Sequence, residues 1–516
     1  MTDPTRRVGL ISLGCPKNLV DSEIILGKLR ERGYQIAADL EQASTVIVNT
    51  CGFIDEAKQE SIDTILEVAA LKRDGLERLL VAGCMVNRYG AELRQEIPEI
   101  DGFIGLDDLL EAPDLLEAPD PLGSPEPGAT GAHAASACAA RPAETTTLVG
   151  LGSSSAPSQQ ASHRVFDHTA PRLLTTRGYA YLKVAEGCNN PCTFCAIPTW
   201  RGRFRSRTIE SLVAEARALE GQVRQSGDPD VGLVEICLLA QDTTRYGEDL
   251  GYGRHGLLRL VEALLTETTV PWIRFLYAYP TTLDPELARL MASEPRFAPY
   301  LDMPLQHSHP ELLRAMRRGG SDSTYRRLLD RVREAVPEVF LRTTFIVGFP
   351  GERHEHFEHL LRFVEQARFD HVGAFVYSPE PGTPAATLAD PVRRRVAVAR
   401  RQELLARQEP IALERRRRLV GSVLPMLIEG PCTESEHLLQ ARHQGMAPEV
   451  DGRVLINDGF APAGTLAEVE ITEAYADDLV GRIVGPDRKG VLPAGRAEVG
   501  AELAASSSEG RAIRCR

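Results

Sequence analysis

The sequence has no apolar run that approaches the roughly 20 residues of a membrane-spanning helix. The first seven residues, MTDPTRR, are not followed by an apolar segment long enough for a signal peptide. Basic residues are in the minority, because 72 Asp and Glu outnumber 59 Lys and Arg and give a net charge of −13. These deficits argue against a membrane protein, a secreted protein and a chain that binds nucleic acid along its whole length. We therefore expect a cytoplasmic protein.

Length and hydrophobic content leave room for several folded domains. The chain has 516 residues, of which 43% are hydrophobic, and this is enough for about three domains with buried cores. Its ten cysteines are expected to be metal ligands or buried thiols, since disulfides are rare in a reducing compartment. Cys237 and Cys432 lie in strand patterns and are expected to be buried, whereas Cys138 and Cys515 are assigned no role.

Three cysteines lie within eight residues in the segment GCNNPCTFC, residues 187–195, at C-x3-C-x2-C spacing. Thiolates are soft ligands that suit iron–sulfur clusters, zinc or copper(I). A cubane cluster usually takes four cysteines, so three of them leave one iron open to bind a small molecule. A structural zinc loop is the alternative, but zinc sites need a fourth ligand, and residues 196–205 contain no Cys or His. The spacing favours a reactive cluster held by Cys188, Cys192 and Cys195.

The first hundred residues alternate between short apolar strands and helical stretches, which predicts a parallel sheet covered by helices. Each predicted strand stops one residue before a cysteine; the strands are Arg7–Gly14, Thr45–Thr50 and Arg78–Gly83. Open α/β sheets bind ligands at the carboxyl ends of their strands, where helix amino termini favour thiolates. Cys15, Cys51 and Cys84 share this position, so we expect a second three-thiolate site. The alternative is that each is an ordinary buried cysteine.

Composition shifts predict the domain boundaries. Residues 111–165 are rich in Ala, Pro, Ser, Gly and Thr and have few large apolar residues, so they are expected to form a disordered insert. The insert separates an amino-terminal domain, residues 6–110, from a second α/β domain, residues 174–419. Residues 420–486 are expected to form a small β-barrel, followed by a flexible tail, residues 487–516.

The second α/β domain is predicted from six strands that alternate with helices; they are Gly178–Ala185, Leu233–Ala240, Trp272–Ala278, Leu301–Leu305, Leu341–Val347 and His371–Tyr377. A repeated βα pattern indicates a barrel or a wound sheet, and the chemistry of such barrels lies on the loops after the strands. The cysteine loop follows the first strand, and Gln306 and His307 lie at the fourth. A Gly/Pro turn, which lets a ligand approach the backbone, follows the fifth strand with the residues Gly348, Phe349, Pro350, Gly351 and Glu352.

Two features of this domain have both a structural and a functional interpretation. His307 and His309 are candidates for ligands or bases, although single histidines commonly have structural roles. Arg393–Arg418 is expected to be a basic helix, whose charges either form a solvated face or contact nucleic acid.

The carboxyl-terminal barrel is predicted from short alternating strands such as Ser422–Glu429, Arg453–Ile456 and Thr465–Thr472. Between residues 421 and 485 the sequence has 3 Arg, no Lys and 11 Asp plus Glu, a net charge of −8. An acidic barrel repels the phosphates of RNA. It suits a basic protein partner through charge complementarity.

Both cysteine triads and the domain order resemble the methylthiotransferases of the radical S-adenosylmethionine superfamily, apart from the insert and the tail. Phe194, just before the third cysteine, also matches that superfamily. One branch of the family modifies an aspartate of ribosomal protein S-twelve, and the other modifies an adenosine next to the tRNA anticodon. The segments that resemble the ribosomal branch are Val8–Glu23, Asn49–Ile62, Gln241–Gly247 and Ala447–Gly452.

The resemblance implies an α/β fold class: an amino-terminal three-layer α/β domain, a central partial (β/α) barrel of the radical type and a carboxyl-terminal TRAM barrel. It also implies two [4Fe-4S] clusters and S-adenosyl-L-methionine. One cluster, on Cys188, Cys192 and Cys195, would cleave S-adenosylmethionine to a 5′-deoxyadenosyl radical. The auxiliary cluster, which would carry the sulfur, is implied on Cys15, Cys51 and Cys84. The implied contacts to S-adenosylmethionine are Gln306, His307, Gly348, Phe349, Pro350, Gly351 and Glu352.

No catalytic side chain is implied beyond the cluster ligands. The expected partners are ribosomal protein S-twelve or the small ribosomal subunit and an electron donor such as flavodoxin or ferredoxin, with no membrane and no direct tRNA substrate. Two alternatives remain open. A tRNA-modifying enzyme would use the arginine-rich helix as its basic face, and a non-catalytic ribosome factor would use both triads as structural metal sites.

Overall fold

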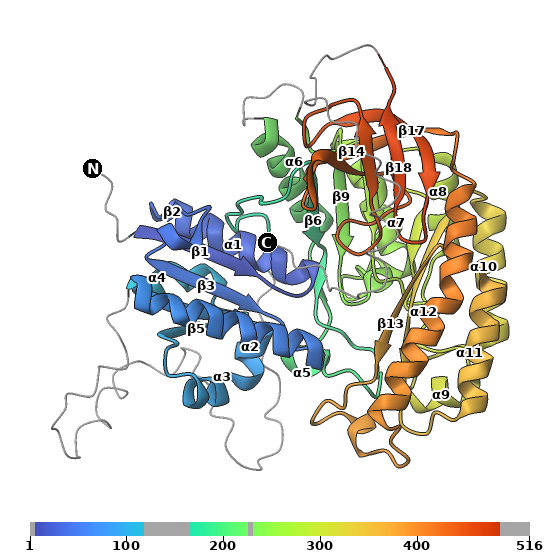
Figure 1. Ribbon diagram of the computed structural model, residues 1–516, viewed down its shortest axis with the longest axis horizontal. Coiled ribbons are helices and arrows are strands. Elements are labelled where there is room, and N and C mark those ends of the chain that lie inside the picture. The colour runs from blue at the N-terminus through green and yellow to red at the C-terminus, as the bar shows by residue number, and fades with distance from the viewer. Residues whose placement is uncertain (1–5, 118–165, 225–230, 486–516) are drawn as a thin grey trace. The chain divides into compact units, whose positions relative to one another are not determined.

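The computed structural model describes residues 6–117, 166–224 and 231–485 (Figure 1). Of these residues, 6–117 and Ala170–Leu173 belong to one compact unit, and 166–169, 174–224 and 231–485 belong to the other. Within the described ranges, no helix is both long enough and apolar enough to cross a membrane. Most of the predicted insert, the predicted tail, Cys138 and Cys515 lie outside the described residues.

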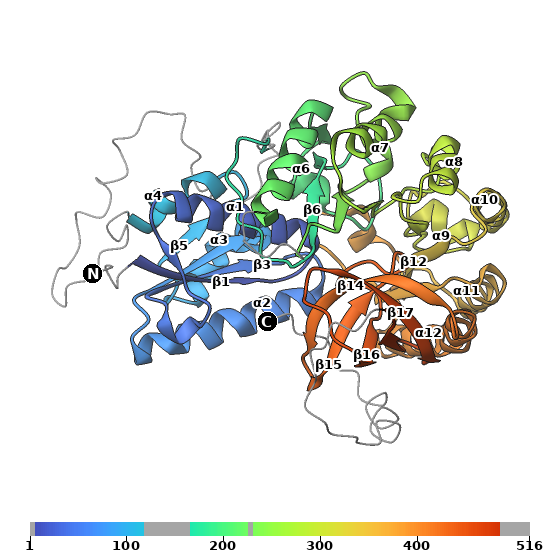
Figure 2. The same ribbon diagram turned by 90° about the horizontal axis from the view of Figure 1, so that it is seen from above.

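The first unit is built on a parallel five-stranded sheet in the order β2-β1-β3-β4-β5. Its strands are β1 (Arg7–Ser12), β2 (Gln35–Ile36), β3 (Thr45–Thr50), β4 (Arg78–Gly83) and β5 (Gly102–Ile104). Its helices are α1 (Pro16–Glu31), α2 (Asp55–Ala70), α3 (Cys84–Glu96) and α4 (Ala112–Glu117). Helices α1 and α2 cover opposite faces of the sheet (Figure 2), which confirms the three-layer arrangement. The central strand β3 is buried along its whole length, as its apolar run predicts.

The prediction of disorder from residue 111 is wrong for residues 112–117, which form α4. Ala112, Pro113 and Leu116 are buried, and Asp114 pairs with Arg32 of α1 at 2.7 Å. A short apolar face next to the folded domain is enough to dock one and a half turns of helix. The average composition of the long segment conceals that face.

The second unit contains a partial parallel barrel. Strands pair in the order β10-β9-β6 and β11-β12-β13, and the amide of Ala278 donates to Asp302 O at 2.8 Å between the two sets. The strands are β6 (Tyr179–Lys183), β9 (Glu235–Leu239), β10 (Trp272–Phe275), β11 (Tyr300–Asp302), β12 (Phe340–Val347) and β13 (His371–Val376). All six predicted strands are confirmed. Two further short strands, β7 (Ala185–Glu186) and β8 (Arg205–Ser206), form an antiparallel pair.

Helices surround these strands and enclose a large apolar core. They are α5 (Ile197–Trp200), α6 (Ile209–Arg224), α7 (Gly256–Glu267), α8 (Pro285–Ser293), α9 (Pro310–Ala315), α10 (Asp322–Ala335), α11 (His354–Ala367) and α12 (Arg394–Arg417). Helices α10, α11 and α12 lie side by side in Figure 1. The predicted basic helix is α12, and several of its arginines are used inside the fold. Arg400 pairs with Glu352 at 2.7 Å and Arg415 with Asp370 at 2.6 Å.

The carboxyl-terminal strands form a closed barrel in the order β14-β15-β16-β18-β17, which confirms the predicted barrel. They are β14 (Val423–Cys432), β15 (Ser435–Arg442), β16 (Val454–Asp458), β17 (Leu466–Ala474) and β18 (Leu479–Ile483). Met426, Ile428, Val454 and Val469 are among the side chains that fill its interior. The sequence SEHLLQAR of β15 has no β-branched residue, which is why strand propensity does not identify it.

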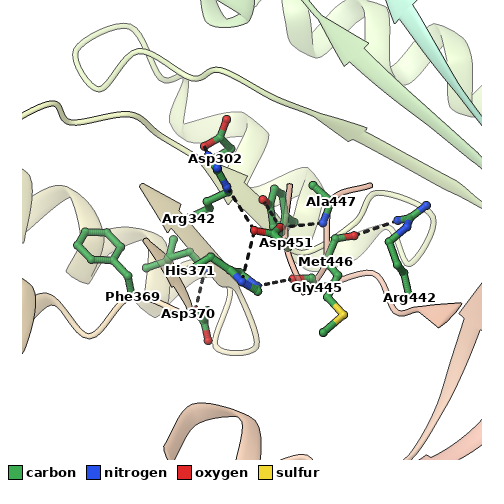
Figure 3. A network of polar contacts seen from close by, with 12 residues as sticks. Asp302, Arg342, Phe369, Asp370, His371, Arg442, Gly445, Met446, Ala447 and Asp451 are labelled. Carbon is green, nitrogen blue, oxygen red and sulfur yellow. Dashed lines mark hydrogen bonds and ion pairs between the residues drawn. The ribbon is translucent and has the colours of Figure 1, made fainter. Parts of the chain in front are cut away.

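The loop between β15 and β16 packs against the amino-terminal ends of the barrel strands (Figure 3). Asp451 of this loop is buried and accepts hydrogen bonds from the hydroxyl of Tyr300 at 2.6 Å and the amide of Ala447 at 2.9 Å. It also pairs with Arg342 at 3.3 Å and with Nδ1 of His371 at 3.4 Å. The small barrel is thus fixed to the end of the sheet opposite the carboxyl ends of its strands.

A second buried ionic group joins the small carboxyl-terminal barrel to the strands of the partial parallel barrel. Glu235 of β9 pairs with Arg274 of β10 and, at 2.8 Å, with Arg442 of β15, and the side chains of all three are at most 2% exposed. Arg442 also donates to Glu429 at 2.5 Å. A buried group of this kind is stable only while every charge keeps its partner.

Replacing Glu235 with alanine is expected to destabilise the protein, because Arg274 and Arg442 both lose their shared partner. The loss of one member of a buried ion pair typically costs about 3–5 kcal/mol. The free energy of unfolding in urea measures this cost. The control is E470A, whose partner Arg482 is half-exposed, and it is expected to cost at most about 1 kcal/mol. Equal losses in the two variants would contradict the assigned role of the buried group.

Stability is expected to fall as the pH drops from about 6.5 to 5, because His443 stays neutral in the fold. Burial lowers the pKa of His443 to about 3, and the same effect comes from the neighbouring positive groups His371, Arg274, Arg416 and Arg442. The unfolded chain binds the proton first, so at pH 5 this single histidine costs about 2 kcal/mol.

Thermal unfolding at pH 7 and pH 5 measures this effect. In H443Q the loss of stability between the two pH values should be smaller than in the parent, whatever the stability of the variant at pH 7. The matched control is His437→Gln, which replaces an exposed histidine of the same barrel. A loss in H443Q as large as that in H437Q would count against the prediction.

Candidate functional site

Three strand ends of the first unit bring Cys15, Cys51 and Cys84 to one edge of the sheet. Strands β1, β3 and β4 are adjacent, and Thr50 at the end of β3 is paired with Gly83 at the end of β4. Cys51 and Cys84 follow these two positions, and Cys15 precedes the first residue of α1. The structure therefore places the three thiols where the sequence predicts them.

Two glycines allow these strand ends to approach closely. Gly14 has a φ of +87°, and a Cβ atom added there would lie 2.6 Å from Cβ and 3.0 Å from Sγ of Cys51. At Gly83, with a φ of +93°, an added Cβ would lie 2.2 Å from Oδ1 of Asn49. A larger residue at either position would displace the thiol-bearing backbone.

Asn18 ties the three strand ends together. Its Nδ2 donates to Leu13 O at 3.2 Å and to Thr50 O at 2.8 Å, and its Oδ1 lies 3.6 Å from Sγ of Cys84. Asn49 donates in turn to Asn18 O at 2.8 Å. Both asparagines are fully buried. Sequence reasoning missed this role of Asn18, although the residue lies three positions after Cys15.

The second cysteine triad lies on the loop of residues 187–195, which follows β7. The amide of Cys188 donates to Gly202 O at 3.1 Å, and the amide of Cys195 donates to Cys192 O at 3.3 Å. Gly187 has a φ of +81°, and a Cβ added there would lie 2.2 Å from Arg203 O. Glycine therefore permits the close contact that fixes the start of the cysteine loop.

The thiols of this loop lie in a protected environment. Burial raises the pKa of Cys188 and raises that of Cys195 to about 12. Asp242 and Cys192 add to the shift of Cys188, and Cys192 and Cys188 add to that of Cys195. Thiols of this kind ionise when a metal supplies positive charge, because metal ligands bind in the deprotonated form. Three thiols carried by one nine-residue loop fit a metal cluster better than isolated core cysteines do.

A buried carboxylate lies immediately before the loop. Glu186 accepts from Lys183 at 2.9 Å, from Arg201 at 3.0 Å and from Gln241 at 2.7 Å. Burial opposes ionisation of this group, but Arg201 and Lys183 outweigh it and keep the pKa of Glu186 well below its usual value. Sequence reasoning missed the role of Glu186. The signal that could have found it is a charged residue within an apolar strand pattern.

Asp242, in the loop that follows β9, contacts the cysteine loop from another side. It accepts from Nδ2 of Asn190 at 2.7 Å and from the hydroxyl of Thr244 at 2.6 Å. Burial raises the pKa of Asp242. Arg245 also reaches Asn190, with 3.3 Å between Nη1 and Oδ1. The loop after β9 therefore helps to hold the cysteine loop, in agreement with a site at the carboxyl ends of the barrel strands.

The Gly/Pro turn after β12 is held by contacts within the protein. Glu352 is buried, accepts the amide of Gly348 at 2.7 Å and pairs with Arg400. Phe349 is fully buried in a small apolar cluster, and Pro350 is also buried. At Gly351 an added Cβ would meet open space. The side chains of Phe349 and Glu352 therefore shape the turn, and a ligand would approach its backbone.

Gln306 and His307 occupy different environments. Gln306 is partly buried and has a φ of +69°, and its main chain bridges to Phe345 of β12. His307 is fully buried, and its Nδ1 accepts the amide of His309 at 2.9 Å. Burial lowers the pKa of His307 well below its usual value, and the positive groups that add to this shift are His309, His359, His356 and Arg400. The ring of His307 thus lies among the residues of the covering helices.

Among the described residues, the group of potential metal ligands whose ligand atoms lie within 4.8 Å of one another is His309, Glu311 and His356. Nδ1 of His309 accepts the amide of Glu311 at 3.3 Å, and Nδ1 of His356 accepts that of Arg353 at 3.2 Å. A neutral histidine whose Nδ1 accepts carries its proton on Nε2. His356 can therefore donate to Glu311 at 3.0 Å, and this arrangement is a hydrogen-bonded connection between α9 and α11.

Family models match three parts of the chain. Residues 7–105 match the uncharacterized protein family UPF0004, residues 182–364 match the radical SAM superfamily, and residues 420–484 match the TRAM domain. The solved structure of the radical S-adenosylmethionine methyltransferase TsrM from Kitasatospora setae aligns over 79% of this chain and 89% of its own. Its TM-score is 0.48 and its sequence identity 14%.

Curated relatives match nearly the whole chain. One from Anaeromyxobacter sp. (strain Fw109-5) is 44% identical over 485 residues, which cover 94% of each chain. Another from Geobacter sulfurreducens is 41% identical over 94% of this chain and 100% of its own. Both are named ribosomal protein uS12 methylthiotransferase RimO. With this identity over this length, the chain belongs to the RimO family of ribosomal protein uS12 methylthiotransferases.

Proposed function

We propose that this enzyme transfers a methylthio group to the β-carbon of an aspartate in ribosomal protein uS12. The observation that carries the proposal is the pair of cysteine triads, one at three strand ends of the first unit and the other on a single loop of the second. Acid–base catalysis cannot break an unactivated C–H bond, so the reaction needs a radical. The cofactor supplies this chemistry. Family membership supports the choice of substrate.

The two donor sets fit two [4Fe-4S] clusters. Cys188, Cys192 and Cys195 would hold one, and the auxiliary set at the sheet edge would hold the other. When bound, the first supplies the electron that cleaves S-adenosylmethionine, and the second supplies the sulfur. The chain's own residues fix these ligands: Asn18 ties the sheet edge together, and Thr193 and Gly187 fix the cysteine loop.

For S-adenosylmethionine we propose main-chain contacts along Gly348–Gly351 and a side-chain contact from Gln306. These positions follow strands β12 and β11 at the same end of the barrel as the cysteine loop. The backbone conformation of the turn is held by the side chains of Phe349, Pro350 and Glu352, so these three residues act on the ligand through the backbone. The buried ring of His307 fits an indirect, structural role better than the direct contact implied by its place in the sequence.

We propose a basic protein surface as the partner of the small barrel, whose strands and loops carry a net charge of −8 between residues 421 and 485. A low-potential one-electron donor such as flavodoxin or ferredoxin would serve the radical cluster. A substrate on the small ribosomal subunit would place the reaction in the cytoplasm. In the basic helix α12, Arg400 and Arg415 are engaged in internal ion pairs, which reduces the charge that the helix can offer to tRNA.

Binding of the two candidate substrates tests this assignment. We expect the purified chain to bind uS12 at 150 mM salt and to bind tRNA only weakly, with an affinity that falls steeply as salt rises. Tight tRNA binding at that salt concentration would favour the tRNA branch. Metal analysis tests the non-catalytic alternative: a brown, oxygen-sensitive iron protein is expected, and a colourless zinc protein would exclude the proposed chemistry.

A further inference from the structure

The carboxyl-terminal end of α9 holds the cysteine loop. The amide of Thr193, between the second and third cysteines, donates to Met316 O at 3.1 Å, and its hydroxyl donates to Ala315 O at 2.8 Å. Phe194 packs against the cluster of apolar side chains that contains Leu312 and Met316. Two hydrogen bonds and an apolar contact thus connect one turn of α9 to the loop that carries the thiols.

The other end of α9 is anchored to α11. The rings of His309, which caps α9, and of the buried His356 on α11 lie 4.3 Å apart, and His356 contacts Glu311 at 3.0 Å. The segment of residues 310–318 is therefore fixed at both ends, and we call it the α9 brace. A segment that is fixed at both ends can hold a functional group in a defined position.

Arg318, the last residue of the α9 brace, reaches a thiol of the loop. Its Nη1 lies 3.7 Å from Sγ of Cys192, while its Nη2 donates to Pro304 O at 2.5 Å. Its guanidinium lies 4.1 Å from the centre of the Tyr279 ring, a cation–π contact. These contacts hold one cationic group against one cysteine.

Among the residues that the structure describes, Arg318 forms no ion pair with a carboxylate, although burial raises the pKa of the nearby Asp242 and the charge of Arg318 acts on that carboxyl to lower it. Asp242 and Arg245 are the charged groups next to Cys188, and they have opposite signs. The charges of Asp242 and Arg245 offset each other, so the charged side chains next to the loop carry a net positive charge, which comes from Arg318 at Cys192. Hydrogen bonds to ligand sulfurs and local charge are two of the factors that set the reduction potential of an iron–sulfur cluster.

We propose that Arg318 is a positioning residue that raises the reduction potential of the cluster bound by Cys188, Cys192 and Cys195. This inference rests on the proposed function. A low-potential one-electron donor adds one electron to the cluster and takes it from the 2+ to the 1+ state. The added negative charge is stabilised by a guanidinium that donates to the sulfur of Cys192. Arginine suits this role, because its charge persists at any working pH and its plane stacks on Tyr279.

The test is a redox titration of the anaerobically reconstituted full-length protein, followed by electron paramagnetic resonance. The radical cluster is identified as the signal that changes when S-adenosylmethionine is added. Dithionite serves as the reductant. In R318Q we expect about a tenfold smaller equilibrium constant for reduction, which is a midpoint about 59 mV lower for one electron. R318K keeps the charge without the planar fork, so its midpoint should lie between those of R318Q and the parent.

The matched control is R314Q, which removes an exposed arginine of the same brace and should leave the midpoint unchanged. Iron content is measured for every variant, so that cluster loss is not mistaken for a shift. If R318Q binds too little iron, R318M takes its place as the neutral variant, and a midpoint equal to the parent's would refute the proposal. A normal cluster with an unchanged midpoint in R318Q would overturn this inference alone. Absence of any signal that responds to S-adenosylmethionine in the parent would overturn the proposed function as well.

Discussion

The Cys188→Ala variant is expected to release no 5′-deoxyadenosine from S-adenosylmethionine. Cys188 is one of only three thiols on the loop of residues 187–195, and this spacing leaves no spare ligand. Changing a residue that merely supports a metal ligand costs about 10–100-fold in affinity or activity, so the loss of a ligand itself should reduce turnover to background. Chromatographic detection of 5′-deoxyadenosine after reduction by dithionite measures the effect.

The matched control for Cys188 is Cys432→Ala, because Cys432 is also buried but lies in the small barrel. We expect this variant to fold and to release 5′-deoxyadenosine at the parental rate. The assignment of the loop would be wrong if the Cys188 variant kept that rate. If both variants lost it, the effect would reflect the general loss of a buried thiol.

The Cys51→Ala variant should separate the two halves of the reaction. Cys51 lies in the other unit, at the sheet edge next to Gly14 and Cys84, and is expected to be needed only for the sulfur. We expect this variant to keep cleaving S-adenosylmethionine in an uncoupled reaction and to form no methylthiolated product. The measurement combines 5′-deoxyadenosine release with the mass of the substrate protein in the same sample.

Two outcomes would argue against the role of Cys51. A normal methylthiolated product would show that the sheet-edge thiols do not carry the sulfur. Loss of S-adenosylmethionine cleavage together with transfer would show that Cys51 is needed for the fold or for the other cluster. A matched variant of the same edge, S61A, removes the hydroxyl that accepts the amide of Cys51 at 3.1 Å and should weaken transfer without abolishing it.

Local sequence predicts the strands and the thiol positions because both depend on short-range patterns. Strands β3 and β4 are confirmed to the residue, since apolar runs of six residues end abruptly at Cys51 and Cys84. Strand β15 and helix α4 are missed, because one has little strand propensity and the other is stabilised mainly by docking on α1. The closed barrel is confirmed from alternation, although two of its strands are not identified.

Contacts between distant residues explain the parts of the site that sequence reasoning missed. Arg318 lies 126 positions from Cys192, and no spacing pattern connects them. Asn18 lies within a segment already recognised as family-like, yet its role depends on the pairing of strands β1 and β3. The position of His307 at a strand end suggests a ligand contact, which stays a prediction, whereas its burial and the positive groups around it depend on the packed helices. Side-chain direction after a strand depends on tertiary packing.

The most direct test of the proposed function is the mass of the product. The reconstituted parent chain is incubated with S-adenosylmethionine and a strong reductant, in separate reactions with ribosomal protein uS12 and with tRNA. We predict a gain of one methylthio group on an aspartate-containing peptide of uS12 and no change in the tRNA. A methylthio group on a tRNA adenosine, with unmodified uS12, would contradict both the substrate assignment and the argument from the acidic barrel.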